Sequence, residues 1–298
     1  MIDAVRQVQV VSALAHLAGN GGWARILAGQ PLLDAVNVAD AELLVAADVL
    51  RERADGRLEP VDLHPWYADP AVLSCGLVAE LRRALNHGCD TEPEGIDPDD
   101  ILAMGAASET VAEILAEAVL PMLPGTRDRL RAGDARFLDV GVGTGAIAKT
   151  LCESYPGTTA VGLDVAPEAL AVARERLGRT PTGASIELRQ QSVVDLADVE
   201  AYDLAWMPQI FLTRADLELG LDRVHRALRP GCWLVMPVAA SSEHSTRFEA
   251  AALAHDAVLR GGGPMSVDCA TALLRAAGFV EVRDMLGVSQ ALLMARKA

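Results

Sequence analysis

One stretch near the middle of the chain, from Arg136 to Gly145, constrains the fold more than any other. It begins with a short apolar run that contains an acid at Asp139, and it continues with a glycine at every second position from Gly141 onward. Residues 146–153 then have the apolar spacing of a helix. Glycine has no Cβ, so a loop of this kind lets backbone N–H groups approach a ligand closely. The stretch therefore predicts a strand, a glycine loop and a helix that together border a ligand site.

Strand and helix patterns alternate through the rest of the chain. Expected strands follow the one at Arg136 and cover 159–164, 185–189, 202–206, 232–238, 279–284 and 289–295, and expected helices cover 108–123, 167–177, 214–228, 245–259 and 266–277. Such alternation is typical of the α/β class, with a doubly wound, mostly parallel sheet of seven strands and helices on both faces. The last two strands are joined by a short turn, so they should pair antiparallel.

The N-terminal third has a different pattern. Apolar spacing predicts helices over 3–18, 23–33 and 41–53, the last capped by Asp40, and a short strand over 57–63. We interpret residues 1–89 as a mainly helical domain, winged-helix-like, that mediates dimerisation or covers a substrate. We interpret the acidic, proline-containing segment 90–100 as a linker, and we interpret residues 101–298 as the α/β domain.

Composition excludes several classes of partner. The formal charge of −15 argues against nucleic acid, because phosphate binding needs clustered Lys and Arg. No apolar run is long enough to cross a membrane, and the start of the chain lacks the pattern of a signal peptide, so we expect a cytoplasmic protein. Five scattered cysteines without a CxxC fit a reducing compartment. His87 and Cys89 have no second cluster of ligands nearby, so no metal site is expected.

The candidate site lies at the carboxyl ends of the strands, where doubly wound sheets bind ligands. Three such ends carry suitable groups: the glycine loop, Asp164 at the end of the next strand, and residues 191–195 after the third. A carboxylate at Asp164 can accept hydrogen bonds from two ribose hydroxyls, and residues 191–195 can border an adenine ring. These features together predict a pocket for an adenosine-containing ligand.

At this point the sequence resembles the class I S-adenosylmethionine-dependent methyltransferases, over about residues 101–298. The resemblance rests on Asp-Val-Gly-Val-Gly-Thr-Gly at 139–145, Asp164, Tyr-Asp-Leu-Ala-Trp-Met-Pro at 202–208, Leu-Arg-Pro-Gly at 228–231 and the closing hairpin after Gly278. It implies S-adenosylmethionine as cofactor and S-adenosylhomocysteine as product. The cofactor contacts that it implies are Asp139, Gly141, Gly143, Thr144, Gly145, Asp164, Val165, Ser192, Val193, Trp206 and Met207. One departure is Ser192, where the family often has an acid that contacts adenine; Asp195 or the backbone could substitute.

A nicotinamide dinucleotide site is the main rival for the glycine loop, because Gly141, Gly143 and Ala146 also fit G-x-G-x-x-A. Asp139 before the loop, the third glycine and the antiparallel last strand disfavour an oxidoreductase. A protein that binds the cofactor without transferring methyl is a second alternative. A third, DNA binding by the N-terminal region, is disfavoured because the expected helix 41–53 has more acidic than basic residues.

The chain also resembles small-molecule O-methyltransferases of bacterial secondary metabolism, which implies a small, fairly apolar acceptor methylated at O, N or C, and a homodimer. Those enzymes usually carry a catalytic His just after the fourth strand, but residues 208–213 contain none. His255 and His244, in the insertion after the fifth strand, are the alternative bases, although each also fits a purely structural role. Gln209 could orient an acceptor.

Overall fold

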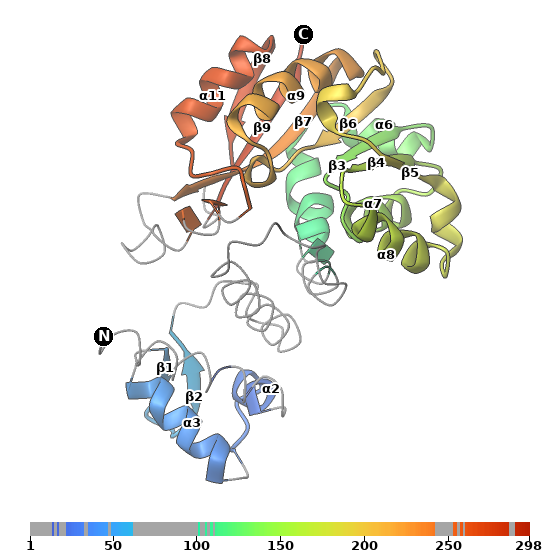
Figure 1. The fold of residues 1–298 in the computed structure, drawn as a ribbon. Coiled ribbons are helices and arrows are strands. Elements are labelled where there is room, and N and C mark those ends of the chain that lie inside the picture. Colours follow the sequence, from blue (N-terminus) through green and yellow to red (C-terminus); the bar gives the residue numbers. More distant parts are fainter. Residues whose placement is uncertain are drawn as a thin grey trace. The chain divides into compact units, whose positions relative to one another are not determined.

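The computed structural model describes residues 14, 17, 22–32, 35–46, 49–61, 101, 105, 108–109, 111–241, 253–254, 257–258, 260–285 and 290–298. The chain divides into two compact units, Met1–Ala107 and Ser108–Ala298, and each is described by itself (Figure 1). The expected linker at 90–100 lies outside the described residues. Within the described part of the chain, no helix is both long and apolar enough to cross a membrane.

Unit 1 contains two helices and a small hairpin. The helices are α2 (Gly22–Leu27) and α3 (Ala35–Ala46), and the strands β1 (Leu50–Glu52) and β2 (Leu58–Pro60) pair antiparallel. The hairpin turns at Asp55 and Gly56, where the Gly56 φ of 77° is one that glycine adopts without strain. A small core of fully or almost fully buried side chains joins these elements: Leu17, Trp23, Ile26, Ala41, Leu44 and Leu50.

Two expectations for unit 1 were wrong in their bounds. The helix expected over 41–53 begins earlier, at Ala35, and ends at Ala46, so Asp40 lies inside α3 and does not cap it. Residues 50–52 form β1 instead, because Leu50 packs into the core while its neighbours pair with β2. The helix expected over 23–33 already ends at Leu27, followed by Gly29 at φ 64°.

Unit 2 is built on a seven-stranded sheet in the order β5-β4-β3-β6-β7-β9-β8 (Figure 1). The strands are β3 (Arg136–Val140), β4 (Thr159–Asp164), β5 (Ile186–Gln190), β6 (Tyr202–Trp206), β7 (Leu228–Ser241), β8 (Phe279–Asp284) and β9 (Gln290–Lys297). Neighbours from β5 to β7 pair parallel, whereas β9 pairs antiparallel with both β7 and β8. The predicted fold, including the reversed last strand, is confirmed.

Helices cover both faces of this sheet. They are α6 (Thr126–Ala132), α7 (Ala146–Ser154), α8 (Pro167–Leu177), α9 (Arg214–Ala227) and α11 (Val267–Ala276), with short turns η2 (Leu115–Val119), η3 (Leu120–Met122), η4 (Pro181–Ser185), η5 (Val193–Asp195) and η6 (Gln209–Phe211). One apolar cluster joins α9 and α11 to one face, and a second joins residues 112–123, α7 and the end of α8 to the other. Because both faces are covered, the central strands are apolar almost throughout.

Two elements of unit 2 differ from expectation for clear physical reasons. Residues 229–231 lie between the helix expected over 214–228 and the strand expected over 232–238, but the structure includes them in β7. Leu228 pairs with Tyr202, and the register then shifts so that Leu204 pairs with Trp233. The extra residues form a bulge, at which Gly231 adopts a φ of 76°.

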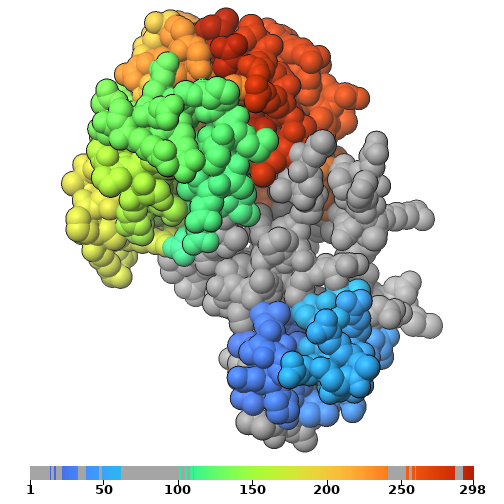
Figure 2. Space-filling view, turned by 180° about the vertical axis from the view of Figure 1, so that it is seen from behind, coloured from blue at the N-terminus to red at the C-terminus, as the bar shows by residue number. Residues whose placement is uncertain are grey.

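The helix expected to Leu123 changes to a π turn at η2 and to a 3-10 turn at η3, where Pro121 has no N–H to continue the ladder. Figure 2 shows this segment beside the closing strands, where Arg283 donates to the Met122 carbonyl at 3.4 Å.

A buried carboxylate joins four elements at the amino ends of the parallel strands. Asp203 of β6 is 3% exposed and accepts a hydrogen bond from the backbone N–H of Arg136 on β3 at 2.9 Å. It also accepts from the guanidinium groups of Arg129 on α6, at 3.3 Å, and of Arg229 on β7. A buried charge is tolerated when it is paired and fully hydrogen-bonded, as Asp203 is.

We expect Asp203→Ala to lower the free energy of unfolding by about 2 to 4 kcal/mol, because it leaves a buried N–H unpaired and removes the counter-charge of two arginines. Urea unfolding measures this change. Glu175→Ala is the matched control: its ion pair with Arg179 is exposed on both sides and should contribute less than about 1 kcal/mol. Equal losses in the two variants would contradict the structural role of Asp203.

Candidate functional site

The glycine loop between β3 and α7 has a backbone that only glycine adopts readily. Gly141, Gly143 and Gly145 have φ angles of 72°, 53° and 76°, all in the left-handed region. The loop folds over the end of β4, where the N–H groups of Gly141 and Val142 donate to the Leu163 carbonyl at 2.8 and 2.9 Å. Each of the three positions therefore favours glycine because the backbone there has a left-handed φ.

Gly162 on β4 is a residue of this site that the sequence reading missed. A Cβ at Gly162 would lie 2.5 Å from Cγ2 of Val142, so only glycine lets the loop pack against β4 at this point. A glycine inside an expected strand is the signal that could have identified it, since such glycines often mark a close approach of another backbone.

Asp164, at the carboxyl end of β4, is bonded to the glycine loop. Its Oδ2 accepts from the backbone N–H of Gly143 at 2.9 Å, and its Oδ1 accepts from that of Ala166 at 3.0 Å. The residue is only half-buried. Each carboxylate oxygen can accept a further bond, so Asp164 is held in place and can still receive two hydroxyl donors.

Asp139 lies beneath the same loop and is almost inaccessible, at 1% exposure. Its Oδ2 accepts from the backbone N–H of Ala148 in α7 at 3.2 Å, while its Oδ1 has no hydrogen-bond partner among the described residues. Burial raises the pKa of Asp139 to about 7, the Ala148 bond opposes this rise, and the nearby Asp164 adds to it. The structure thus joins Asp139, the three glycines and Asp164 in one place, as the sequence predicted.

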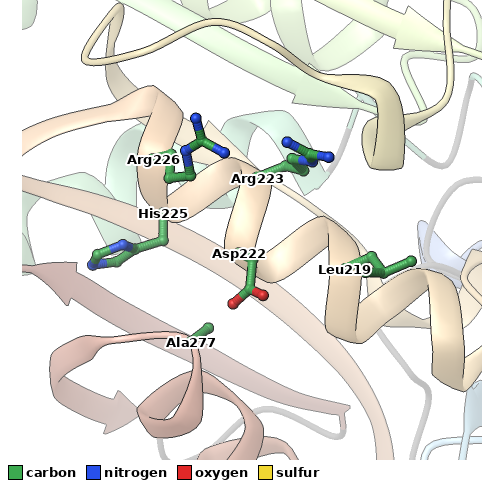
Figure 3. A pocket seen from close by; sticks show the side chains of 6 residues that line it. All are labelled: Leu219, Asp222, Arg223, His225, Arg226 and Ala277. Carbon is green, nitrogen blue, oxygen red and sulfur yellow. The ribbon is translucent and has the colours of Figure 1, made fainter.

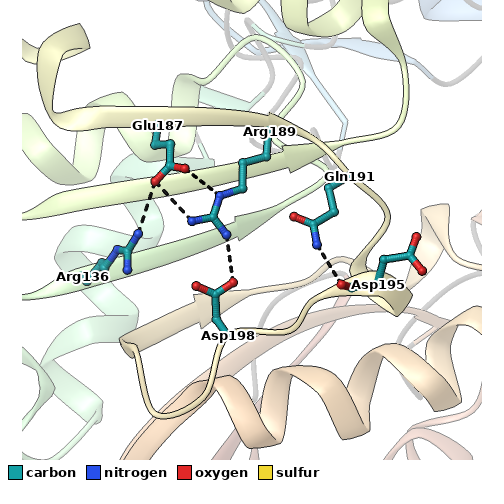
Figure 4. A network of polar contacts seen from close by, with 6 residues as sticks. All are labelled: Arg136, Glu187, Arg189, Gln191, Asp195 and Asp198. Carbon is teal, nitrogen blue, oxygen red and sulfur yellow. Dashed lines mark hydrogen bonds and ion pairs between the residues drawn. The ribbon is translucent and has the colours of Figure 1, made fainter.

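The segment after β5 is fixed by a polar network (Figure 4). Arg189 donates to Glu187 and, at 2.8 Å, to Asp198, and the side chain of Gln191 donates to the backbone carbonyl of Asp195 at 2.9 Å. Ser192 accepts from the N–H of Val194 and so begins the η5 turn. Ser192 therefore has a local structural role, and its contact with adenine stays a prediction.

The apolar candidates for cofactor contact fall into two groups. Val165, directly after Asp164, is 66% exposed, so it can pack on a ligand. Val193 and Met207 belong instead to the core under α9, close to Gly220, and Trp206 belongs to the core on the other face of the sheet. Met207 has no exposed surface and packs in the core, and its contact with the cofactor stays a prediction.

Gln209, which the sequence suggested for orienting an acceptor, is fully buried. Its Nε2 donates to the carbonyls of Gly262 and Gly263 at 3.2 and 3.0 Å, and its Oε1 accepts from the N–H of Ala239 at 3.0 Å. A Cβ on Gly262 would lie 2.5 Å from the carbonyl oxygens of Gln209 and Ile210. The geometry gives Gln209 a structural role that joins the segment after β6 to the end of β7 and to the glycine-rich segment 261–263.

Of the histidines proposed for the site, the structure describes neither His255 nor His244. His87 and Cys89 also lie outside the described residues, so the roles of all four stay predictions. Among the described residues, no three His, Cys, Asp or Glu side chains gather as metal ligands would. His225 packs edge-on against Phe279, at 5.0 Å between ring centroids, and burial lowers its pKa, which fits a structural role.

A cavity of about 420 Å³ next to His225 lies elsewhere in the fold (Figure 3). It is lined by Leu219, Asp222, Arg223, His225, Arg226 and Ala277. The C-terminal half of α9 leads to the start of β7, so this cavity lies toward the amino ends of the strands. It is therefore separate from the edge that carries Asp164 and the glycine loop.

Comparisons with known proteins identify a methyltransferase domain within unit 2. A family model described as a methyltransferase domain matches residues 138–234, from β3 to β7. Release factor glutamine methyltransferase of Cereibacter sphaeroides is 26% identical over 260 residues, which cover 74% of this chain and 90% of that protein.

Solved structures share the fold at low sequence identity. Human N-acetylserotonin methyltransferase, solved in complex with SAM, has a TM-score of 0.66 and 16% identity, covering 99% of this chain and 96% of that one. CalO1, a methyltransferase in calicheamicin biosynthesis in its SAH-bound form, has a TM-score of 0.60 and 18% identity, covering 100% of this chain and 97% of that one. At these identities the likeness shows the fold.

The raised pKa of Asp139 predicts a specific dependence of stability on pH. Between about pH 4 and pH 7 the folded chain keeps the Asp139 proton that the unfolded chain has lost, so the free energy of unfolding falls as pH rises through this window. The rise from 3.8 to about 7 corresponds to roughly 4 kcal/mol at most. Asp139→Asn should remove this part of the slope in urea unfolding measured from pH 4.5 to pH 8. An unchanged slope in the variant would contradict the burial argument.

The strand order, the loop of three left-handed glycines bonded to Asp164, and the matching domain model agree with one another. We conclude that unit 2 has the fold of the class I S-adenosylmethionine-dependent methyltransferases and that residues 138–234 within it match a methyltransferase domain.

Proposed function

We propose that the chain transfers a methyl group from S-adenosylmethionine to a small-molecule acceptor of the natural-product kind, at O, N or C. One observation carries the proposal: the likeness to solved structures covers 99% to 100% of the chain, so it includes unit 1 as well as the methyltransferase unit. One of those proteins is an N-acetylserotonin methyltransferase and the other a methyltransferase in calicheamicin biosynthesis, and both are small-molecule contexts.

The residues at the carboxyl edge fit the cofactor in chemistry as well as in place. Asp164 is held by Gly143 and Ala166 with lone pairs left for the ribose hydroxyls. Asp139 has an unpaired buried oxygen, which favours a cationic group such as the amino group of the cofactor's methionine end. The loop glycines have no Cβ to keep the ligand at a distance.

Methyl transfer is an in-line displacement, in which the acceptor's lone pair forms the new bond as the bond from sulfur to the methyl carbon breaks. The bound sulfonium supplies the activated methyl group, and the chain must mainly hold donor and acceptor in line. A base is needed only for an acceptor that must lose a proton. His255 and His244 are our candidates for that base. The side-chain amide of Gln209 is not basic, and it already bonds to Gly262, Gly263 and Ala239.

The remaining features of the proposal concern context. We infer a bacterial, cytoplasmic enzyme of secondary metabolism that acts as a homodimer. Residues 1–89, followed by a linker over 90–100, would provide dimer contacts or substrate cover. The net charge of −15 supports a partner other than nucleic acid.

A protein acceptor is the second candidate, because the Cereibacter sphaeroides relative is named for methylating glutamine in a release factor. That relative aligns with 74% of this chain, which leaves part of the chain without a counterpart in it. We therefore favour the small-molecule acceptor. Binding of the cofactor without transfer, and oxidoreductase chemistry, are both disfavoured by the methyltransferase domain match.

Removing the ribose-binding carboxylate should abolish cofactor binding. We expect Asp164→Ala to weaken S-adenosylmethionine by at least about 100-fold in calorimetry, since it removes two charge-assisted hydrogen bonds to the ligand and frees the loop. The matched control is Asp222→Ala, at an exposed aspartate on α9 away from the carboxyl ends of the strands, and this variant should bind like the wild type. Failure of the wild type to bind would refute the cofactor assignment for this site.

The nature of the acceptor can be tested by product analysis. Incubation with labelled S-adenosylmethionine should transfer label to one or more members of a panel of hydroxylated and amino aromatic metabolites, with equimolar release of S-adenosylhomocysteine. A purified bacterial release factor in the same assay should stay unlabelled. Label on the release factor alone would contradict the small-molecule acceptor, and binding without any label would favour a non-transferring protein.

A further inference from the structure

We propose that Arg176, on α8, is a positioning residue for the cofactor loop: it holds the hydroxyl of Thr144 and is itself held by Glu109. The proposal rests on the assignment of the glycine loop to S-adenosylmethionine and adds two residues, Arg176 and Glu109, that neither the sequence motifs nor the comparisons place at this site.

The first contact is made within the glycine loop. Nη1 of Arg176 donates to Oγ1 of Thr144 at 3.0 Å, and Thr144 is only 3% exposed. Thr144 lies between Gly143, whose N–H donates to Asp164, and Gly145, where the loop enters α7. A loop that consists largely of glycine has high backbone entropy when it is not held, so a side-chain bond from outside the loop reduces that freedom.

The second contact joins the same guanidinium to another segment. Nη2 of Arg176 donates to Oε1 of Glu109, near the start of unit 2. Arg176 is about one-quarter exposed and Glu109 about one-half, so Arg176 is the more enclosed member of the pair. The planar fork of an arginine can bond two partners at once, which a lysine cannot do in the same geometry.

Leu177, the residue after Arg176 on α8, also contacts the glycine loop. A Cβ on Gly145 would lie 2.9 Å from Cδ1 of Leu177, so the end of α8 packs directly against the loop. Leu177 therefore contacts the loop by apolar packing, while Arg176 binds it by a charge-assisted hydrogen bond. The last turn of α8 thus acts on two consecutive loop residues, Thr144 and Gly145.

Calorimetry of the full chain with S-adenosylmethionine tests the proposal. Arg176→Met and Thr144→Val should each weaken binding by about tenfold, because each removes the same charge-assisted bond. The double variant should be about as weak as the weaker single variant, since the two residues share one interaction. Thr144→Ser keeps the hydroxyl and should bind within about threefold of the wild type, and Glu109→Gln should give a smaller loss than Arg176→Met.

Arg179→Met is the matched control, because Arg179 lies just beyond α8 and pairs only with the exposed Glu175 among the described contacts. It should bind like the wild type. Thermal unfolding of each variant separates a loss of fold from a loss of affinity. If Thr144→Val does not fold, the affinities of Arg176→Met, Arg176→Lys and Glu109→Gln for S-adenosylmethionine test the proposal instead. The expected order of affinity there is wild type, then Glu109→Gln and Arg176→Lys, then Arg176→Met.

Two results would overturn the proposal. One is wild-type affinity in Arg176→Met, and the other is full additivity of the Arg176→Met and Thr144→Val losses. Both are distinct from a wild type that does not bind S-adenosylmethionine at all, which would instead overturn the function proposed above.

Discussion

The hydrogen bond from the Gly143 N–H to the Asp164 carboxylate, 2.9 Å long, is the contact on which the site depends. It joins the loop after β3 to the end of β4, the neighbouring strand. Each condition for this bond is met by a particular residue: the left-handed φ of Gly143 turns its N–H toward Asp164, and Gly162 leaves room for Val142 to cross β4. The bond therefore organises the loop and orients the carboxylate before any ligand is present, which lowers the entropic cost of binding.

The sheet supplies the rigidity that this contact needs. Apolar clusters on both faces enclose the central strands, and the carboxylate of Asp203 joins α6, β3, β6 and β7 at the opposite edge. The buried carboxylate of Asp203, at the amino ends of the strands, is thus paired with two arginines and a backbone N–H. At the carboxyl edge, by contrast, Asp139 keeps an unpaired oxygen and a raised pKa, and Asp164 keeps free lone pairs. A buried carboxylate with a raised pKa at the carboxyl ends of the strands marks this side of the sheet as the candidate binding site.

Much of unit 2 could be predicted from sequence because local pattern and fold agree there. The bounds of β4, β6, β8 and α8 follow directly from apolar runs, a proline at the first helical turn and flanking glycines. Unit 1 was harder, because its strands have three residues each and are set by pairing and by a small core, not by periodicity. The contacts of Gln209, Arg176 and Asp203 could not be predicted, since each joins segments far apart in the chain and depends on tertiary placement.

The most direct test of the account is a crystal structure of the full chain with S-adenosylhomocysteine. We expect the ribose hydroxyls within hydrogen-bond distance of Asp164, with Gly143 still bonded to that carboxylate, and the methionine end of the ligand against the loop that contains Thr144. An adenosine bound at another edge of the sheet, or an Asp164 that does not contact the ribose, would contradict it.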